Sequence, residues 1–562
     1  MATSQQSRTE EMIVQSRPRQ LVPQLLLIAC IFELFYLLIV ALSPLRELHL
    51  SNSPLAAGAS WTLVPFSLLS SVLRPWTGSL LDSTEFASLL LGITFLGILA
   101  VYLPAIVLIV RERPEATRRW LYLLLGGALL FGITLLFQPK LFSDDVFTYI
   151  FSGRILTIYG ADPLNTAPVR YPADPYLAWV LSGRNTPNIY GPLWISVTAL
   201  LAGISNVPVF SLLLFKGFAL LTHLSNCVLI WGILNEIAPS RRVLGTLLYA
   251  WNPLAVIELA GSGHNEGFLL VLLLLATWLY IRAVRTSRRW LFLCMLGVFG
   301  LAISTNLLSL LLAPLYLWFH LRKERSVTRA AWSFCACLLL MLVPEALISL
   351  PFWRGASTFF AVTSAVDIEH FVHSPVGTLA IPIRAVFQFV ATAGHFPAFL
   401  QPISAADVAL RASALFIFVL IYTHLFGRVR HAPGSVALAL QKRRTEAIDV
   451  EMRLPAFDVL FYSCGVAVFW YLILVSGWFW PWYLLWTLWP VALRRLDGFT
   501  VAILILSGTA LFLYSFIGFT RGPIATYQAA LIFGIPLIFL IVARIRGQKG
   551  PVVSHERRGE TT

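Results

Sequence analysis

Long apolar segments that recur along the chain constrain its fold more than any other feature of the sequence. Runs long enough to cross a bilayer recur from Leu21 to Ala543, and 58% of the 562 residues are hydrophobic whereas 12% are charged. Lipid offers an open backbone no hydrogen-bond partner, so segments that cross it must be mostly helical. The chain is therefore predicted to be an all-α polytopic membrane protein.

The basic residues lie mostly in short segments between the apolar runs. The formal net charge is +14. Because lysine and arginine gather on the cytoplasmic side of membrane proteins, we interpret this charge as a signal of membrane topology, and no nucleic-acid partner is expected. Placing these residues inside predicts about fourteen spans. Residues 1–20 and 546–562 are then cytoplasmic tails of a transmembrane domain at 21–545. The expected spans lie near 21–43, 86–110, 120–138, 207–235, 243–260, 267–284, 290–304, 305–320, 329–350, 405–426, 456–476, 481–493, 498–517 and 524–545.

With the basic residues placed inside, the alternation of the spans also predicts a large external loop at residues 139–206 and a second external loop at 351–404. A helix that begins at Tyr190 cannot cross the membrane, because a crossing would place Arg241 outside. This helix should lie along the outer interface, with Trp194 at headgroup depth. Long loops in compact proteins are usually functional. The chemistry is therefore expected on the extracytoplasmic side of the plasma membrane.

Two adjacent carboxylates open the first external loop, where residues 143–149 read SDDVFTY. A carboxylate that is partly withdrawn from water has a raised pKa and can act as a general base near neutral pH. Asp144 and Asp145 are therefore candidate catalytic residues. The alternative is a polar helix terminus in which both side chains complement the dipole of the following helix.

Two cations near this segment are candidate phosphate ligands. Arg154 lies nine residues after Asp145, and a guanidinium binds phosphate through two parallel hydrogen bonds. Its alternative is an ion pair with an aspartate of the same loop. Lys216 lies inside an apolar run, where an ionisable residue is a candidate for function. Its alternative is to extend its ammonium group to the interface.

A polar turn, residues 261–267 (GSGHNEG), joins two apolar runs on the outer side. His264 can donate to a phosphate or a sugar hydroxyl, and Glu266 can orient it. The alternative is a turn whose polar groups only cap the two helices. Glu258 and Glu345 are carboxylates inside apolar runs, and each is a candidate partner for a nearby cation.

Aromatic residues gather in a late turn at residues 477–483 (GWFWPWY). An aromatic belt at the membrane interface explains such a cluster, but aromatic faces also stack on sugar rings. The candidate acceptor-binding residues are Trp480, Trp482 and Tyr483, together with His370 and His373 of the second external loop. No phosphate-binding loop, dinucleotide fingerprint or zinc signature is present in the sequence. No cofactor is expected to be required, although the paired aspartates leave a divalent metal possible.

These residues resemble the polyprenyl-phosphate-mannose-dependent α-1,6-mannosyltransferases of actinobacterial cell envelopes, which are integral-membrane glycosyltransferases of the C fold class (GT-C). The resemblance runs from about residue 120 to 490. The matching segments are SDDVFTY at 143–149, Gly153-Arg154, GADP at 160–163, YGPL at 190–193, Asn252-Pro253, GHNE at 263–266 and WYLLW at 482–486. Two departures are Glu266, where aspartate is commoner, and Asn306, where related enzymes often have a lysine.

The resemblance implies a GT-C fold and transfer of a hexose, most simply mannose in an α-1,6 linkage, from a polyprenyl-phosphate donor. The acceptor would be an envelope glycan or a lipid-linked glycan. Asp145 would take the place of the family's catalytic-loop aspartate and act as general base in an inverting displacement, with Asp144 in a supporting role. Arg154, Lys216, Tyr190 and the 264–266 turn, including Asn265, would hold the donor. The alternatives are a polyprenyl-linked glycan flippase or polymerase and a secondary transporter, although no internal repeat typical of transporters is found.

Overall fold

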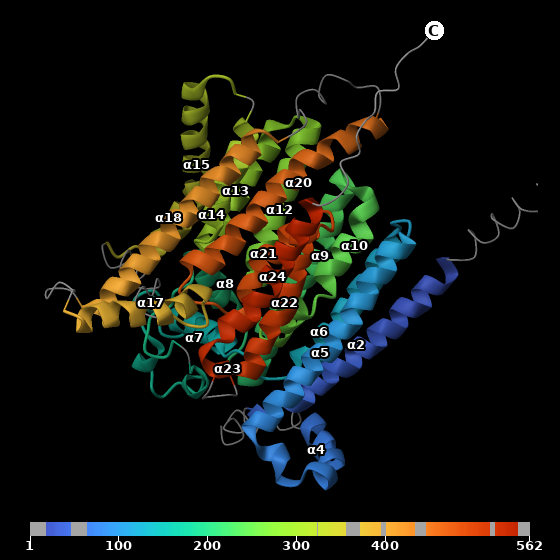
Figure 1. The fold of residues 1–562 in the computed structure, drawn as a ribbon, viewed down its shortest axis with the longest axis vertical. Helices are drawn as coiled ribbons and strands as arrows, with labels where there is room; N and C mark the ends of the chain where they lie inside the picture. The colour runs from blue at the N-terminus through green and yellow to red at the C-terminus, as the bar shows by residue number, and fades with distance from the viewer. Residues whose placement is uncertain are drawn as a thin grey trace, which may run out of the picture.

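The computed structural model describes residues 18–46, 64–181, 183–322, 324–355, 371–394, 401–432, 446–517 and 523–548. Helices dominate this part of the chain, and no named strand occurs among the described residues. The long helices pack side by side in one bundle, and short helices gather at one of its ends (Figure 1). The predicted all-α architecture is confirmed.

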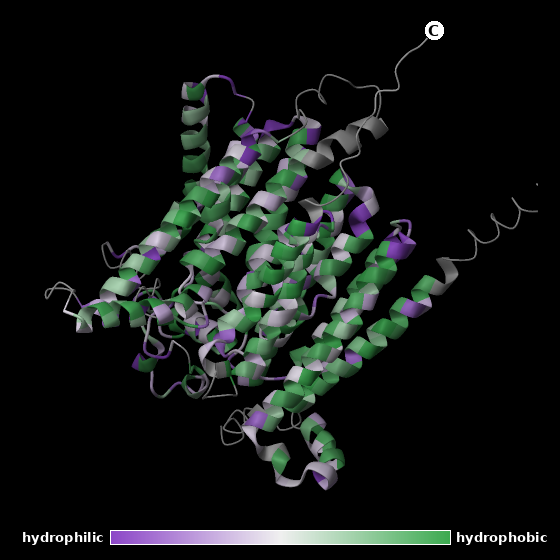
Figure 2. Ribbon diagram, viewed as in Figure 1, coloured by the Kyte–Doolittle hydropathy of each residue, from purple (hydrophilic) through white to green (hydrophobic). Residues whose placement is uncertain are grey.

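Eleven helices of the described residues are long and apolar enough to cross a membrane, or twelve if one bent pair counts as a single span. Hydrophobic residues make up most of the long helices, while hydrophilic residues gather near the helix ends and in the loops (Figure 2). This distribution is the one expected of a protein whose solvent is lipid. The long helices are α2 (Pro18–Arg46), α5 (Thr84–Glu112), α6 (Arg118–Leu136), α9 (Pro208–Ile237), α12 (Glu266–Thr286), α15 (Val327–Ser349), α17 (Pro375–Thr392), α18 (Pro402–Arg430), α20 (Glu446–Trp470), α22 (Gly498–Phe516) and α24 (Gln528–Gln548).

The predicted count of about fourteen spans is too high because three of the predicted spans are short helices. The expected break near Asn306 is present, and it separates α13 (Arg289–Thr305) from α14 (Ser309–Leu321). Both are shorter than the roughly 20 residues that a crossing needs. The span expected at 481–493 contains α21 (Leu485–Ala492), which has only 8 residues.

Helix α17 is the long apolar helix that the predicted topology lacks. It falls in the segment expected to be the second external loop. In Figure 1 it lies across the direction of the long helices, at the same end of the bundle as the first external loop. Length and composition alone therefore make α17 a candidate span, whereas its orientation resembles that of a helix at the interface.

A bent element carries the His264 turn into the interior. Helix α10 (Arg242–Ala250) ends before Pro253, and α11 (Pro253–Val256) continues into the π-helical turn η7 (Ile257–Gly261). The bend measures 53°. Proline lacks the N–H that would continue the helix, and Oδ1 of Asn252 accepts a hydrogen bond of 3.0 Å from the N–H of Leu254. The chain is therefore kinked at Asn252-Pro253.

The segment predicted to be the first external loop folds as a layer of short helices, called the external layer below: α7 (Asp145–Thr157), η4 (Pro168–Arg170), η5 (Leu177–Trp179) and α8 (Pro192–Ala202). Helix α8 has 11 residues, so it cannot cross a bilayer, as predicted. It packs directly on α7, where a Cβ atom at Gly153 would lie 2.3 Å from the carbonyl oxygen of Thr198. Only glycine allows this approach of the two helices.

The position predicted for Trp194 is wrong. Its side chain is 2% exposed, and its ring lies 5.2 Å from the ring of Tyr149 and 6.0 Å from that of Phe268. The indole therefore fills the protein interior between the external layer and the long helices, and does not anchor the protein at the lipid headgroups.

A buried ion pair holds the external layer together. The Nε and Nη2 atoms of Arg154 lie 3.0 Å and 2.9 Å from Oδ2 of Asp174, and the Asp174 side chain is fully buried. The guanidinium also lies 4.4 Å from the centre of the Tyr176 ring. The alternative interpretation of Arg154, an ion pair within the loop, is the one that the structure shows.

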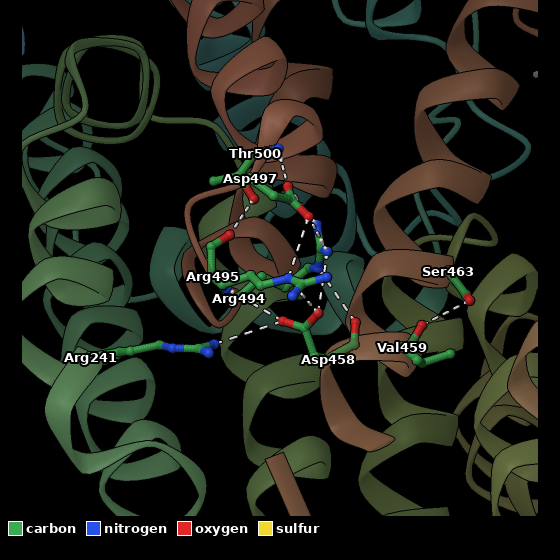
Figure 3. A network of polar contacts seen from close by, with 8 residues as sticks. All are labelled: Arg241, Asp458, Val459, Ser463, Arg494, Arg495, Asp497 and Thr500. Atoms are coloured by element: carbon green, nitrogen blue, oxygen red, sulfur yellow. Dashed lines mark hydrogen bonds and ion pairs between the residues drawn. The ribbon is translucent and has the colours of Figure 1, made fainter. Parts of the chain in front are cut away.

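A second polar network lies at the other end of α9, which is 30 residues and therefore about 45 Å long (Figure 3). Nη2 of Arg494 lies 2.7 Å from Oδ2 of Asp497 and 3.4 Å from Oδ2 of Asp458. Arg241 and Arg495 reach the same Asp458 carboxylate. These arginines belong to segments predicted to be cytoplasmic, and their meeting at one end agrees with that common side.

Substituting Asp174→Asn is expected to destabilise the protein. Removing one partner of a buried ion pair leaves the other charge without compensation, which costs about 3–5 kcal/mol. The melting temperature of the detergent-solubilised protein should fall clearly, and Arg154→Ala should produce a similar fall. The double variant should lose less than the sum of the two, because its single variants break the same pair. Unchanged melting temperatures in both single variants would contradict this role for the pair.

Candidate active site

Asp144 and Asp145 have different environments although they are adjacent. Asp144 is the residue before α7, and its Oδ2 accepts a hydrogen bond of 3.0 Å from the N–H of Leu181. Its side chain is buried. Asp145 begins α7, and 19% of its side-chain surface is exposed. Asp144 therefore ties two parts of the loop together, while Asp145 keeps a carboxylate surface that a ligand can reach.

Tyr190 binds the Asp145 carboxylate from the start of α8. Its hydroxyl donates a hydrogen bond of 3.2 Å to Oδ2 of Asp145. The hydroxyl of Tyr149, one turn along α7, lies 3.2 Å from the Tyr190 hydroxyl and 3.4 Å from Oδ1 of Asn265. The structure thus brings the YGPL segment and the 264–266 turn to the carboxylate of Asp145.

His264 lies between carboxylates. Its Nδ1 atom is 3.6 Å from Oδ2 of Asp145 and 3.9 Å from Oε2 of Glu266, while its Nε2 atom is 3.4 Å from Oε2 of Glu258. The preceding Gly263 has a φ of 78°. A side chain there would also meet Val146 and Lys216 at 3.2 Å. Glycine is therefore required for the turn that directs His264 toward Asp145.

Burial and neighbouring charges tune the two ionisable groups at the centre of the site. Desolvation raises the pKa of Asp145; the negative charges of Asp144 and Glu258 add to this, while His264 and Tyr190 oppose it. Desolvation lowers the pKa of His264, but the interaction with Glu258 and the charges of Asp145 and Glu266 outweigh it, so the net shift is upward. Asp145 thereby becomes a better proton acceptor, and His264 favours its cationic form.

The late aromatic turn continues from His264 as a ladder of rings. The ring of Trp482 stacks on His264 at 4.0 Å, and Trp480 stacks on Trp482 at 5.1 Å. The ring of His373 meets Trp480 edge-on at 4.9 Å. The backbone of Val372 makes two hydrogen bonds to this turn. Its N–H donates to the carbonyl oxygen of Gly477 at 2.9 Å, and its carbonyl oxygen accepts from the N–H of Phe479 at 2.9 Å.

Of the two remaining candidate acceptor residues, Tyr483 lies beside this ladder. Tyr483 stacks on Trp486 at 4.5 Å and meets Trp482 edge-on at 5.9 Å. His370 lies outside the described residues. The described part of the candidate acceptor set, His373, Trp480, Trp482 and Tyr483, is therefore one contiguous group beside His264.

The two predicted phosphate-binding cations are engaged by the protein itself. Lys216 is fully buried, and its Nζ donates to the carbonyl oxygens of Leu135, at 3.0 Å, and of Gln138. These carbonyls lie at the C-terminal end of α6, where a positive charge complements the helix dipole. Arg154 pairs with Asp174, as described above. None of these contacts brings Lys216 or Arg154 to the Asp145 carboxylate.

Sequence reasoning missed three residues of the site and its support. Asp174 lies in an irregular part of the loop, and nothing in its spacing indicates that it meets Arg154. Tyr149 belongs to the SDDVFTY segment, and its position one turn after Asp145 was an available signal. Tyr514 is an ordinary residue of an apolar helix, yet its hydroxyl donates a hydrogen bond of 2.7 Å to Oε1 of Glu258.

The arrangement can remove a proton from a hydroxyl group. It offers a partly exposed carboxylate with a raised pKa, a hydrogen-bond donor on that carboxylate and a cationic imidazole beside it, all at one end of a helical bundle. These are the parts of a general base. Within the described residues, no group of three or more His, Cys, Asp and Glu side chains is arranged to hold a metal ion.

Comparison with known proteins relates the N-terminal part of the chain to one family. No curated protein matches the chain. Residues 50–322 match the sequence model described as alpha-(1->6)-mannopyranosyltransferase, N-terminal domain. The matched segment contains the external layer, Glu258 and the His264 turn, whereas the aromatic turn and α22 lie beyond it. The chain therefore carries an alpha-(1->6)-mannopyranosyltransferase N-terminal domain over residues 50–322 and is a helical membrane hexosyltransferase.

Proposed function

We propose that this mannosyltransferase takes mannose from a polyprenyl-phosphate donor and transfers it to a hydroxyl of an envelope glycan or glycolipid at the extracytoplasmic face of the plasma membrane. The observation that carries the proposal is the Asp145 carboxylate, partly exposed and held by Tyr190 and His264 at the end of the bundle. A donor with a lipid tail suits a protein whose chemistry lies at the edge of the membrane.

The transfer is a single displacement. Asp145 takes the proton of the acceptor hydroxyl as its oxygen attacks the anomeric carbon of the donor. The bond from that carbon to the phosphate oxygen breaks, and polyprenyl phosphate leaves with the electron pair. The configuration at the anomeric carbon inverts, so an α-linked product requires a β-linked donor. The carboxylate and the leaving group must lie on opposite faces of the sugar.

The charge around Asp145 constrains where the donor phosphate lies. Asp144 and Glu258 place negative charge beside the base, and such a group repels a phosphate. His264 is the cation nearest to the base, and its positive charge acts across the sugar on the phosphate that leaves from the opposite face. Because Lys216 and Arg154 are bound to protein groups, this proposal gives them a structural role: they stabilise the segments around the site.

The aromatic ladder provides the acceptor side. Trp480 is only half-buried and stacks on Trp482, which in turn stacks on His264. A sugar ring that packs on such a face is held by its C–H groups against the π surface. His373 and Tyr483 flank the ladder, so they are the polar groups in place to bind the sugar hydroxyls.

The orientation follows from the two ends of α9. One end carries the Asp145 site, and the other carries the arginine network of Figure 3. Positive residues gather on the cytoplasmic side, so the opposite end, with the site, faces outward.

Replacing Asp145→Asn is expected to lower the turnover number by a factor of about 100 or more, because general-base catalysis contributes on this order. Proteoliposomes supplied with polyprenyl-phosphate mannose and a mannoside acceptor measure the transfer. The matched control is Asp162→Asn in the same loop, whose side chain accepts hydrogen bonds from Leu164 and Asn165 in a turn that asparagine can retain. Near-normal transfer by the Asp145 variant, with an unchanged melting temperature, would refute the assigned base.

His264→Gln is expected to move the acidic limb of the kcat/KM profile to higher pH. Asp145 must be unprotonated to act, and the His264 cation lowers its pKa. Without that cation the pKa of Asp145 rises, so activity that is present at neutral pH is lost at a higher pH than in the wild type. The plateau at high pH should also fall, because stabilisation of the leaving phosphate is reduced. An acidic limb that does not move would contradict the electrostatic role of His264.

Chelation is expected to leave the transfer rate unchanged, because the proposal assigns the stabilisation of the leaving phosphate to His264 and to no resident metal. The measurement is transfer in EDTA-treated proteoliposomes, with and without added Mg²⁺ or Mn²⁺. Loss of activity that a divalent ion restores would show instead that a metal completes the phosphate site.

A further inference from the structure

Glu258 is a fully buried carboxylate in the midst of apolar helices. Such a group is costly unless charges and donors compensate it. It has both. Oε1 accepts a hydrogen bond of 2.7 Å from the Tyr514 hydroxyl of α22, and Oε2 lies 3.4 Å from Nε2 of His264. Through His264, the carboxylate of Glu258 is linked to the reaction centre, since the other ring nitrogen of His264 faces Asp145.

The backbone fixes this arrangement as well. Glu258 lies in the π-helical turn η7, and the N–H of His264 donates a hydrogen bond of 3.1 Å to the carbonyl oxygen of Glu258. Single π-helical turns are rare and occur frequently at functional sites. The main chain and the side chain of Glu258 therefore both hold the residue that contacts the base.

The other end of this chain of contacts is also anchored. The ring of Tyr514 stacks on Phe142 at 4.5 Å. Phe142 lies three residues before Asp145 in the loop that leads into α7. The contacts thus form a continuous series from Asp145 through His264, Glu258 and Tyr514 to Phe142, which lies in the segment that carries Asp145. A carboxylate that served only to fill the interior would not need this closed path.

We infer that Glu258 is a positioning residue for the transfer: it holds the imidazole of His264 by Nε2, keeps it cationic, and thereby aims an Nδ1–H group at the Asp145 carboxylate. The inference rests on the proposed role of Asp145 as base. It adds to that role a residue that touches neither donor nor acceptor, and Tyr514 as the donor that fixes its orientation.

The sign of the pH effect depends on the charges that face Asp145 and His264. The ionisable groups around them are Asp144, Tyr149, Tyr190, Glu258, Glu266, Tyr483 and Tyr514. Replacing Glu258 by glutamine removes a negative charge, which by itself lowers the pKa of Asp145. It also removes the strongest support for the His264 cation, and loss of that cation raises the pKa of Asp145. The second effect is the larger, because His264 is nearer to Asp145 and is the main charge acting on it.

The test is the pH profile of Glu258→Gln, with KM for donor and acceptor measured separately. We expect the acidic limb of kcat/KM to move up by about one pH unit, which is about a tenfold loss below the limb, with both KM values unchanged. Glu258→Asp should restore part of the profile because it keeps the charge. The matched control is Glu345→Gln on α15, a half-buried carboxylate whose Oε1 accepts from Ser349 four residues along. Its profile should equal that of the wild type.

A double-variant cycle separates positioning from packing. If Glu258 acts through His264, the Glu258→Gln and His264→Gln double variant should have an acidic limb at or slightly below that of His264→Gln alone, because only the direct charge of Glu258 is then lost. Effects that simply add would overturn the inference, as would an unmoved limb in Glu258→Gln. If Glu258→Gln does not fold, Tyr514→Phe decides: a fall in kcat at unchanged KM supports the inference, and wild-type kcat and profile refute it.

Failure of the inference and failure of the proposed function are distinguishable. If Asp145→Asn keeps full transfer, the base itself is misassigned. If Asp145→Asn loses transfer while Glu258→Gln and Tyr514→Phe keep the wild-type pH profile and kcat, the base stands and the positioning role of Glu258 is refuted.

Discussion

The structure around the site depends on one imidazole placed among buried carboxylates. Asp145, Glu258 and Glu266 all lie within 4 Å of a His264 ring nitrogen. In a low-dielectric interior these acids repel one another and are poorly solvated. A cation at their centre offsets both costs. For the same reason the pKa of His264 is raised, although desolvation alone would lower it. Every element that carries one of these groups is thereby held to the same point.

The membrane fold makes this placement possible because it brings distant segments to one end of the bundle. Asp145 begins a short external helix, Glu258 lies in the π-helical turn after a proline bend, and Trp482 comes from a late turn. Glycines allow the close approaches: a Cβ atom at Gly191 would lie 2.0 Å from the carbonyl oxygen of Ser304. The family match ends at residue 322, so the C-terminal half adds Tyr514 and the aromatic ladder to a site whose proposed base lies in the matched part.

Much of the fold was predictable because membrane helices follow hydropathy. The helical class, the break near Asn306 and the failure of α8 to cross are all confirmed. The span count and the position of Trp194 were wrong, because hydropathy does not distinguish a side chain that faces lipid from one that faces another helix. The ordered motifs also named Asp145, Tyr190 and His264 as candidates, and the structure places them in contact.

The sequence by itself determined that this chain is a helical membrane protein and which short segments carry its polar chemistry. Both follow from local composition: the cost of an open backbone in lipid, and the rarity of carboxylates and imidazoles in apolar runs. Only the tertiary structure decided the partners. Arg154 meets Asp174 and not a phosphate site, and Glu258 meets both His264 and Tyr514. Such pairings depend on how helices rotate and cross, which no local pattern encodes, because each apolar face has many neighbours it can pack against.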